Sequence, residues 1–490
     1  MLDVEINLAT LIQDQAETNP NAIAVLDGAR KISFGVFAKA INVLARALAA
    51  EGVGPSMKVG IDVAKPYDHW LAILAVMRLG AVSTTLPSRD GMERARQVDL
   101  DLILSTNPAS DFKTAAKKFI YADNRWVEKA RPEAENMRLP DAELAARSLG
   151  RIVFSSGTTG MPKGIFVPAD RLAHTVNIYS KTASPVSRHY NGYGIESLQG
   201  HPLGSWSKGG AVVLNHDFRG RAEEFAHAVT AATYIMTSAA TLGGILDAMP
   251  GVFPGRDDRV ITVSAAALPV ALRDEALARL CGRVEVSYSS MELGIMAEGD
   301  AALQDRHPGA VGFAADGVDL QIVDAQGRET PTGVEGAVRV RSRFMAPGYL
   351  NSPEATAQFF RDGWFCPGDR AFKEADGLIV ILGRDSDVLN LSGAKFSASE
   401  IENEVSQAAN VKDCCALTMP STAGLEILVI LVVLGDGGEE EAVKREAGER
   451  LSGIEIGNFD LIPVDEIPRN SRGKISRPQL VTWLQEKSRS

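Results

Sequence analysis

Cysteine is scarce in this chain, with four residues among 490. Cys281, Cys366, Cys414 and Cys415 match none of the spacings with which cysteines bind zinc. Cys414 and Cys415 are neighbours in a predicted strand, so their side chains should point to opposite faces and fill buried space instead of forming a redox pair. This use of cysteine predicts a cytoplasmic protein.

Long apolar runs and a secretory signal are missing as well. The longest candidate run, Leu425 to Leu434, has the length of a buried strand and falls short of the roughly 18 residues that a membrane span requires. The first residues, Met1 to Gln13, lack a basic region followed by an apolar core, so we expect no secretory signal.

Positive charge is in deficit. The chain has 51 Lys and Arg against 62 Asp and Glu, a formal net charge of −11. This excess of acid argues against nucleic acid or an anionic membrane surface as the main partner. It does not argue against phosphate binding, because a phosphate site needs only local hydrogen-bond donors.

What the chain has is the composition of a soluble globular protein, with 45% hydrophobic and 23% charged residues. Single cores stop growing near about 250 to 300 residues, so a chain of this length should divide into two or three domains. Strand patterns at Val59–Val63 and Ala81–Leu86 flank a helical pattern at Tyr67–Leu79, which predicts a βαβ unit. Short alternating runs at Val318–Val323 and Ala337–Arg341 predict a small β-barrel-like subdomain.

The end of the chain reads as a separate α+β unit of a size that can fold alone. A capping box at Ser397–Glu400 opens a helix that should end at Ala408. The elements expected after it are strands Cys414–Leu417 and Leu425–Leu434, helix Glu440–Leu451 and strand Leu461–Val464.

The most informative segment is a run of glycines and hydroxyl residues between two predicted strands, Ile152–Phe154 and Ile165–Val167. Glycines let the backbone turn tightly with its N–H groups pointing inward, hydroxyls add donors and a lysine adds positive charge. The run therefore predicts a loop that holds a triphosphate, although a Gly/Ser/Thr cluster alone is more often a plain turn. The spacing of the P-loop is absent. The predicted phosphate-binding residues are Ser155, Ser156, Gly157, Thr158, Thr159, Gly160 and Lys163.

The segment Thr158-Thr159-Gly160-Met161-Pro162-Lys163-Gly164 resembles the phosphate-binding loop of the AMP-forming adenylate enzymes. This superfamily contains acyl-CoA synthetases, aryl-CoA ligases, luciferases and nonribosomal-peptide adenylation domains. The resemblance implies an α/β fold with a large N-terminal domain, residues 1–385, that is built of α/β subdomains and the small β-barrel-like subdomain and binds ATP and the acid. It also implies a small mobile α+β C-terminal domain, residues 386–490, that carries a catalytic lysine.

A second motif, Tyr288-Ser289-Ser290-Met291-Glu292, resembles the superfamily's Tyr-Gly-x-Thr-Glu segment. The resemblance implies that Tyr288 stacks on adenine beside Ser289, and that Glu292 is a catalytic carboxylate that holds Mg²⁺ against the phosphates. Met291 stands where a phosphate-contacting threonine is usual, so one hydroxyl donor is missing. Taken alone, the segment reads as a surface turn.

Two further segments complete the implied nucleotide site. Ala265 and Ala266 replace a glycine-rich stretch on the adenine side, although composition alone equally allows a helix start there. Trp364-Phe365-Cys366-Pro367-Gly368-Asp369 resembles Gly-Trp-x-x-Thr-Gly-Asp, with Pro367 in place of threonine. The resemblance implies that Asp369 binds both ribose hydroxyls, because a carboxylate has two acceptor oxygens, and that Arg384 assists it.

The C-terminal motifs bear on both half-reactions, the formation of the adenylate and the transfer to a thiol. Ser386 falls where the superfamily has its hinge residue, usually Asp or Lys, and Gly393 falls where a glycine lets pantetheine pass the backbone. The stretch from Pro468 to Arg477 resembles the motif Pro-Arg-Thr-x-x-Gly-Lys-x-x-Arg. The resemblance implies that Lys474 is the catalytic lysine.

The acid substrate is the least determined feature. In the region that should form its pocket, Tyr193, His201 and Trp206 are polar-tipped candidates that favour a small or functionalised acid. Glu196 lies about where amino-acid-activating relatives bind the substrate amine, but a charge on a helix face is the competing interpretation.

The resemblance therefore implies an AMP-forming ligase with ATP, Mg²⁺ and CoA as its cofactors, acting as a monomer or homodimer. It would activate a small carboxylic acid to an acyl-adenylate and transfer the acyl group to the CoA thiol. One alternative is a stand-alone adenylation enzyme that loads an acid or amino acid onto a carrier protein. A remote alternative is a non-catalytic nucleotide-binding homologue.

Overall fold

A computed structural model gives the fold of the chain. It describes residues 7–87, 90–123, 126, 138–155, 162–193, 200–214, 222–248, 251–264, 267–307, 309–384, 388–391, 394–420, 426–435, 437–454, 459–469, 475 and 477–487. Within these ranges, every helix is too short or too polar to cross a bilayer.

The N-terminal part contains a six-stranded sheet with the order β6-β5-β3-β4-β7-β8, parallel except for β8 at its edge. Its strands are β3 (Lys58–Asp62), β4 (Val82–Thr85), β5 (Leu100–Ser105), β6 (Ala116–Tyr121), β7 (Gly150–Ser155) and β8 (Lys163–Pro168). Its helices are α1 (Leu11–Thr18), α2 (Phe34–Ala50), α3 (Pro66–Arg78), α4 (Gly91–Gln97) and α6 (Ala142–Ser148). Because β3 and β4 pair in parallel on either side of α3, the predicted βαβ unit is confirmed.

Local sequence explains where these helices begin and end. The hydroxyl of Ser33 accepts a hydrogen bond from the backbone N–H of Val36, which caps α2. Pro66 opens α3. Proline lacks a backbone N–H, but at the first position of a helix this group would have no acceptor within the helix. Gly80 follows α3 with a φ of +69°, a conformation that costs glycine little, so the chain turns directly into the next strand.

The middle of the chain forms a second, larger sheet that runs β18-β19-β17-β20-β21-β15-β14-β13-β12-β11-β9-β10-β1-β2, with β16 paired to β17. Towards the β2 edge, its strands are β9 (Arg188–Asn191), β10 (Ala211–Val213), β11 (Tyr234–Thr237), β12 (Val260–Ser264), β13 (Arg283–Ser290) and β14 (Gly294–Asp300), with β1 (Ile23–Asp27) and β2 (Arg30–Ser33) at the edge itself. The helices beside them are α7 (Ala169–Ser180), α8 (His201–Ser207), α9 (Ala222–Ala231), α10 (Ala239–Ala248) and α11 (Val270–Arg279).

The β-rich region predicted after residue 309 is present as a continuation of this sheet with its own apolar core. Its elements are β15 (Ala310–Ala314), β16 (Asp319–Val323), β17 (Gly336–Arg341), α12 (Pro353–Phe359), β18 (Phe360–Arg361), β19 (Trp364–Phe365), β20 (Asp369–Lys373) and β21 (Ile379–Arg384). β15 joins it to the rest, because this strand pairs with β14 on one side and β21 on the other. Gly312 allows β15 to approach β14 closely, since a Cβ added there would lie 2.0 Å from the carbonyl oxygen of Glu298.

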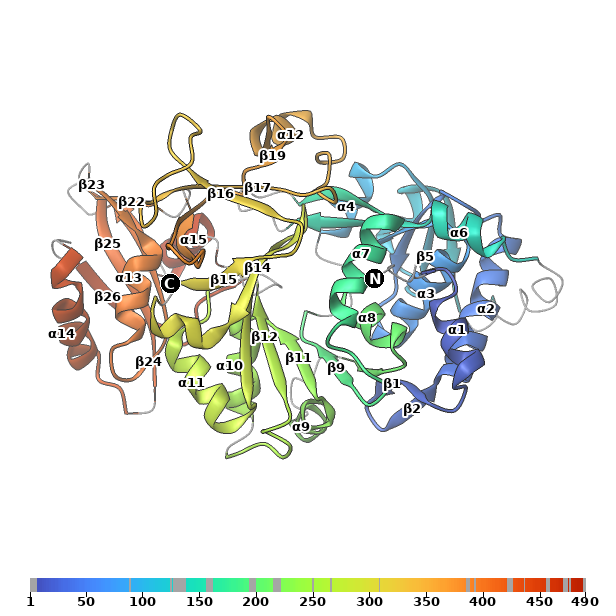
Figure 1. The fold of residues 1–490 in the computed structure, drawn as a ribbon, viewed down its shortest axis with the longest axis horizontal. Coiled ribbons are helices and arrows are strands. Elements are labelled where there is room, and N and C mark those ends of the chain that lie inside the picture. The colour runs from blue at the N-terminus through green and yellow to red at the C-terminus, as the bar shows by residue number, and fades with distance from the viewer. Residues whose placement is uncertain are drawn as a thin grey trace.

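The C-terminal elements form an α+β unit that contains the predicted elements in their order, with a strand pair before them and one more helix after them. They are β22 (Val388–Leu391), β23 (Ala394–Ser397), α13 (Ala398–Ser406), β24 (Val411–Pro420), β25 (Glu426–Leu434), α14 (Glu440–Leu451), β26 (Phe459–Pro463) and α15 (Arg477–Lys487). In Figure 1 this unit lies at one end of the molecule and the six-stranded sheet at the other, with the largest sheet between them. The division of the chain at residue 386 stays a prediction.

The cysteines fill cores, as predicted for the adjacent pair. Cys414 and Cys415 are neighbours in β24 and point into two different apolar clusters on the two faces of the C-terminal sheet. Cys281 is buried in the cluster beneath α10 and α11, and Cys366 is half-buried. Burial raises the pKa of the Cys281 thiol to about 12.

Candidate active site

The predicted phosphate loop connects two antiparallel strands. Ser155 ends β7, Lys163 begins β8, and the two residues face one another in the register of the pair. Residues 156–161 lie outside the described part of the chain. The hairpin therefore fixes both ends of the loop and places the ammonium of Lys163 at its base.

Lys163 lies beside Glu292, which is far away in the sequence. The ammonium is 5.8 Å from the ring centroid of Tyr349 and 5.3 Å from that of Phe359. The Tyr349 hydroxyl donates a hydrogen bond of 2.7 Å to Glu292. Burial lowers the pKa of Lys163, and the negative charge of Glu292 opposes that shift. The structure thus brings the predicted metal-side carboxylate to the base of the predicted phosphate loop.

Arg171, the third residue of α7, is a second cation at this carboxylate. Its side chain is buried, and it donates a 2.5 Å hydrogen bond to the carbonyl oxygen of Met291. Burial lowers the pKa of Arg171 to about 10, against the attraction of Glu292 and Asp170. Arg171 therefore balances the charge of a buried carboxylate and fixes the turn that carries it.

Neither Arg171 nor Tyr349 was predicted from the sequence. Arg171 gave one usable signal, a basic residue close after the second strand of the phosphate hairpin. Tyr349 gave none, because it lies in an irregular stretch and reaches Glu292 only through the tertiary fold.

The residues predicted for the nucleoside side also meet. Asp369 begins β20 and pairs in register with Arg384 of β21, whose Nε donates a 3.0 Å hydrogen bond to its carboxylate. The Tyr288 hydroxyl, from β13, donates to the other oxygen of the same buried carboxylate. Burial and the charge of Asp369 raise the pKa of Tyr288 well above its usual value. Each oxygen of Asp369 thus accepts a hydrogen bond. Two ribose hydroxyls could donate to the same oxygens, either beside the present donors or in their place.

The predicted acid segment touches this region through Tyr193. Its hydroxyl donates a 2.6 Å hydrogen bond to the carbonyl oxygen of Thr237 and lies 3.0 Å from the Ser264 hydroxyl. Ser264 Oγ lies 3.5 Å from the hydroxyl of Ser289. Tyr193 therefore connects the predicted acid side with the strand ends that carry the predicted adenine side.

Trp206 and His201 are both in α8 but have different surroundings. Trp206 is fully buried among the rings of Phe37 and Trp70, and its indole N–H donates to the carbonyl of Ala24 at 2.8 Å. This packing gives Trp206 a structural role and does not support its assignment to the acid pocket. His201 is buried as well, but packs against Tyr179 and Tyr234.

The two arginines of the motif predicted to carry the catalytic lysine both make ion pairs. Arg469 donates to both oxygens of Asp413 at 2.7 and 2.9 Å. Arg477 donates to Glu402 at 2.6 Å and to the carbonyl of Ala416 at 2.8 Å. The two arginines of the C-terminal motif, which flank Lys474 in the sequence, are therefore bound to β24 and α13.

Many predicted site residues lie outside the described part of the chain, and their roles stay predictions. They are Ser156, Gly157, Thr158, Thr159, Gly160, Glu196, Ala265, Ala266, Ser386, Gly393 and Lys474.

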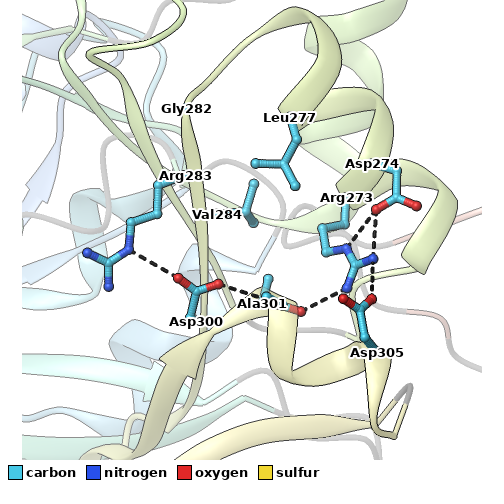
Figure 2. A pocket seen from close by; sticks show the side chains of 10 residues that line it. Arg273, Asp274, Leu277, Gly282, Arg283, Val284, Asp300, Ala301 and Asp305 are labelled. Atoms are coloured by element: carbon cyan, nitrogen blue, oxygen red, sulfur yellow. Dashed lines mark hydrogen bonds and ion pairs between the residues drawn. The ribbon is translucent and has the colours of Figure 1, made fainter.

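A surface hollow at the opposite end of β13 and β14 does not offer a second anion site (Figure 2). Arg273 contacts Asp274 and Asp305 at 2.7 Å each and donates to the carbonyl of Ala301. Arg283 is 3.4 Å from Asp300. The guanidinium groups of this hollow are therefore already paired with carboxylates.

The residues present fit a magnesium ion held largely by a substrate. Among the described residues, no group of three or more His, Cys, Asp or Glu side chains could hold a metal. A Mg²⁺ ion usually takes one or two carboxylates and completes its shell with phosphate oxygens and water. A single carboxylate at the base of the phosphate hairpin, Glu292, suits that arrangement.

Comparison with known proteins agrees with this geometry. Residues 12–350 match the family model described as AMP-binding enzyme. The chain is 27% identical over 514 residues to 4-chlorobenzoate–CoA ligase of an Arthrobacter species, covering 97% of this chain and 94% of that protein. It is 23% identical over 500 residues to tyrocidine synthase 2 of Brevibacillus parabrevis, covering 97% of this chain and 14% of that protein.

Solved structures show the same fold. The crystal structure of the anthranilate CoA ligase AuaEII with anthranoyl-AMP superimposes with a TM-score of 0.82 at 19% identity, covering 100% of this chain and 99% of that one. ATP-bound MatB from Rhodopseudomonas palustris gives 0.81 at 23% identity, covering 98% and 99%. The predicted fold class is therefore confirmed.

Proposed function

Because the chain belongs to the AMP-binding enzyme family, we propose that it activates a small carboxylic acid with Mg-ATP and transfers the acyl group to the thiol of CoA. The first step gives an acyl-adenylate and pyrophosphate, and the second gives a thioester and AMP. The observation that carries the proposal is the meeting of Lys163, Arg171 and Glu292 at the base of the phosphate hairpin.

The chemistry explains why cations gather there. A carboxylate that attacks the α-phosphate of ATP is an anion attacking an anion, so catalysis needs positive charge at the attacking oxygen and at the leaving pyrophosphate. Lys163 and the N–H groups of the predicted loop would bind the outer phosphates. Mg²⁺ on Glu292 would supply further charge between phosphate oxygens. Lys474 would lie between the attacking carboxylate and the α-phosphate.

The nucleoside would be held by the second group of residues. Asp369 would accept hydrogen bonds from both ribose hydroxyls, with Arg384 holding its carboxylate in place. The ring of Tyr288 would pack on adenine, while its hydroxyl stays on Asp369. The solved structures of the same fold with bound ATP and with bound anthranoyl-AMP support this use of the fold.

Some of the similar proteins are CoA ligases, which favours CoA as the acceptor, and others are much longer synthetases. The CoA ligase of Arthrobacter is matched over 94% of its length. The chain spans only 14% of tyrocidine synthase 2 and 6% of the malpinin synthetase of Mortierella alpina. Transfer to a carrier-protein thiol is therefore the second candidate.

The test measures pyrophosphate release with a panel of small aliphatic and aromatic acids, each with CoA, with a carrier protein or with neither. We expect release that depends on one acid and a thioester that forms faster with CoA. A higher kcat/KM with the carrier protein would favour the second candidate. ATP binding without pyrophosphate release from any acid would contradict both.

A further inference from the structure

The largest sheet has one polar face, and the part of it around His189 and Tyr234 is buried. Side chains alternate along a strand, so residues paired in register share a face. Ile235, Ile261 and Val263 point to one side and pack in an apolar core with α10 and α11. The other face, by the same registers, carries His189, Tyr234, Thr262, Ser264, Glu285, Ser287 and Glu298.

Helices α7 and α8 cover part of this polar face and add Tyr179 and His201 to it. The His201 ring lies 3.7 Å from the Tyr179 ring and 5.1 Å from that of Tyr234, measured between centroids. His189 stacks on Tyr234 at 4.9 Å, and the two imidazoles are 6.0 Å apart. His189 is 2% exposed and His201 4% exposed.

Within the described ranges, both imidazoles lack hydrogen bonds. None of their four ring nitrogens has a partner among these residues, and neither has the buried hydroxyl of Ser287. The contrast is His69, also buried, whose two nitrogens lie 2.9 Å from the carbonyl of Val63 and 2.9 Å from the Thr85 hydroxyl. Buried polar groups are almost always paired, so the His189–His201 pair is incomplete without a further partner.

This pair adjoins the predicted acid segment. Tyr179 and Tyr234 both lie near Tyr193, whose hydroxyl is 3.0 Å from that of Ser264. Ser264 ends β12 near the predicted adenine side, whereas Tyr234 begins β11 and His189 pairs with it. The polar face therefore runs from the predicted reaction centre back along the strands to the imidazoles.

We propose that His201 and His189 bind the end of the acid remote from its carboxylate, and that this end carries an uncharged group that both donates and accepts hydrogen bonds, most simply a hydroxyl. This assignment rests on the proposed function and names the class of its substrate.

The chemistry of the pair selects such a group. A neutral imidazole offers one N–H donor and one nitrogen acceptor, which matches a hydroxyl. Burial lowers the pKa of His189 to about 4 and that of His201 well below its usual value, so neither ring supplies positive charge for a second carboxylate. Of the nearby acids, Glu285 is 3.0 Å from Arg283 and accepts a hydrogen bond from the Thr262 hydroxyl, and Glu298 is exposed to solvent, so neither is a buried carboxylate available to an amine.

The first test compares acids that differ by one hydroxyl. The probes are benzoate against meta- and para-hydroxybenzoate, and hexanoate against omega-hydroxyhexanoate, in the pyrophosphate assay. We expect kcat/KM at least tenfold higher for the hydroxylated member of the best pair. His201→Phe should bring this ratio towards one, and His201→Gln, which keeps a donor and an acceptor, should retain part of it. His69→Phe is the matched control and should keep the wild-type ratio. An unchanged ratio in His201→Phe would overturn the assignment.

The second test needs no activity and separates this proposal from the proposed function. In the ligand-free protein, His69→Phe should lower Tm because it breaks two hydrogen bonds, whereas His201→Phe should not, because it breaks none. The hydroxylated acid should raise the Tm of wild type more than its parent acid does, and His201→Phe should lose that difference. Equal shifts by both acids in wild type would overturn the subsite even if pyrophosphate is released. Should no acid release pyrophosphate, the proposed function fails, and the difference in Tm still decides the subsite.

Discussion

Glu292 is a buried carboxylate whose neighbours are Lys163, Arg171 and the Tyr349 hydroxyl. If it binds Mg²⁺, Glu292→Gln should lower turnover by roughly 10²-fold, because an amide oxygen carries no charge for the metal. The Mg²⁺ concentration needed for half-maximal rate should rise. Titration of Mg²⁺ at fixed ATP measures both effects, and the exposed Glu335→Gln serves as the control. An unaltered Mg²⁺ dependence would remove Glu292 from the metal site.

Asp369 receives the Tyr288 hydroxyl and the guanidinium of Arg384. Asp369→Ala should raise KM for ATP and weaken AMP binding by roughly 10- to 100-fold, the effect of losing hydrogen bonds to a charged acceptor. Tyr288→Phe removes one donor to Asp369 but keeps the ring, so its effect should be smaller. Calorimetric titration of AMP compares the two. AMP binding that is unaffected by Asp369→Ala would contradict the ribose assignment.

His189 links the stability of the protein to pH. Its imidazole has a pKa of about 4 when folded, against 6.5 as the ordinary value. The unfolded chain therefore binds more protons between these values, so the stability that is present above pH 6.5 falls as the pH drops towards 4. The slope is about 1.4 kcal/mol per pH unit for this one group. Urea unfolding at several pH values should show a shallower fall in His189→Phe than in wild type, while the exposed His227→Gln follows wild type.

At the scale of elements, the sequence predicted most of what is local. Pro66 and the alternation in β16 and β17 each act within a few residues, so their elements formed where expected, within two residues at their ends. The joining of β15 to both β14 and β21 depends on register between distant strands, and no local pattern encodes it. Tyr349 and Arg171 could not be predicted for the same reason, because they reach Glu292 only through the tertiary fold. Trp206 was predicted to line the acid pocket, but its packing in the core does not support that role.

The close approach of β14 and β15 should make the stability of the protein sensitive to one added methyl group. In Gly312, φ is +92° and an added Cβ would meet the Glu298 carbonyl, whereas Gly317 has a φ of +76° and nothing within 4 Å. Gly317→Ala should cost about 1 kcal/mol of unfolding free energy, from the backbone strain alone. Gly312→Ala should cost about 1–3 kcal/mol more, because the clash adds to it. Chemical denaturation of both variants measures this difference, and equal losses would show that the sheet adjusts freely there.

At the scale of the whole molecule, the catalytic lysine expected in the C-terminal unit should serve only one of the two half-reactions. Lys474→Ala should lower acyl-adenylate formation by ~10²–10⁴-fold, the effect of removing one transition-state charge. The same variant should still convert a synthetic acyl-adenylate to thioester when the thiol is supplied. Single-turnover assays of each half separate the steps. Equal losses in both would contradict a lysine that acts in adenylation alone.

The reactivity of the buried cysteines reports which core of the protein has become exposed to solvent. Cys414 can react with an alkylating reagent only when one face of the C-terminal sheet is exposed, and Cys415 only when the other face is. Cys281 can react only when the core under α10 and α11 opens. Cys366, half-buried, should be modified first. The order in which peptides gain mass after a pulse of reagent therefore distinguishes unfolding of the C-terminal unit from unfolding of the larger part, in the unaltered protein.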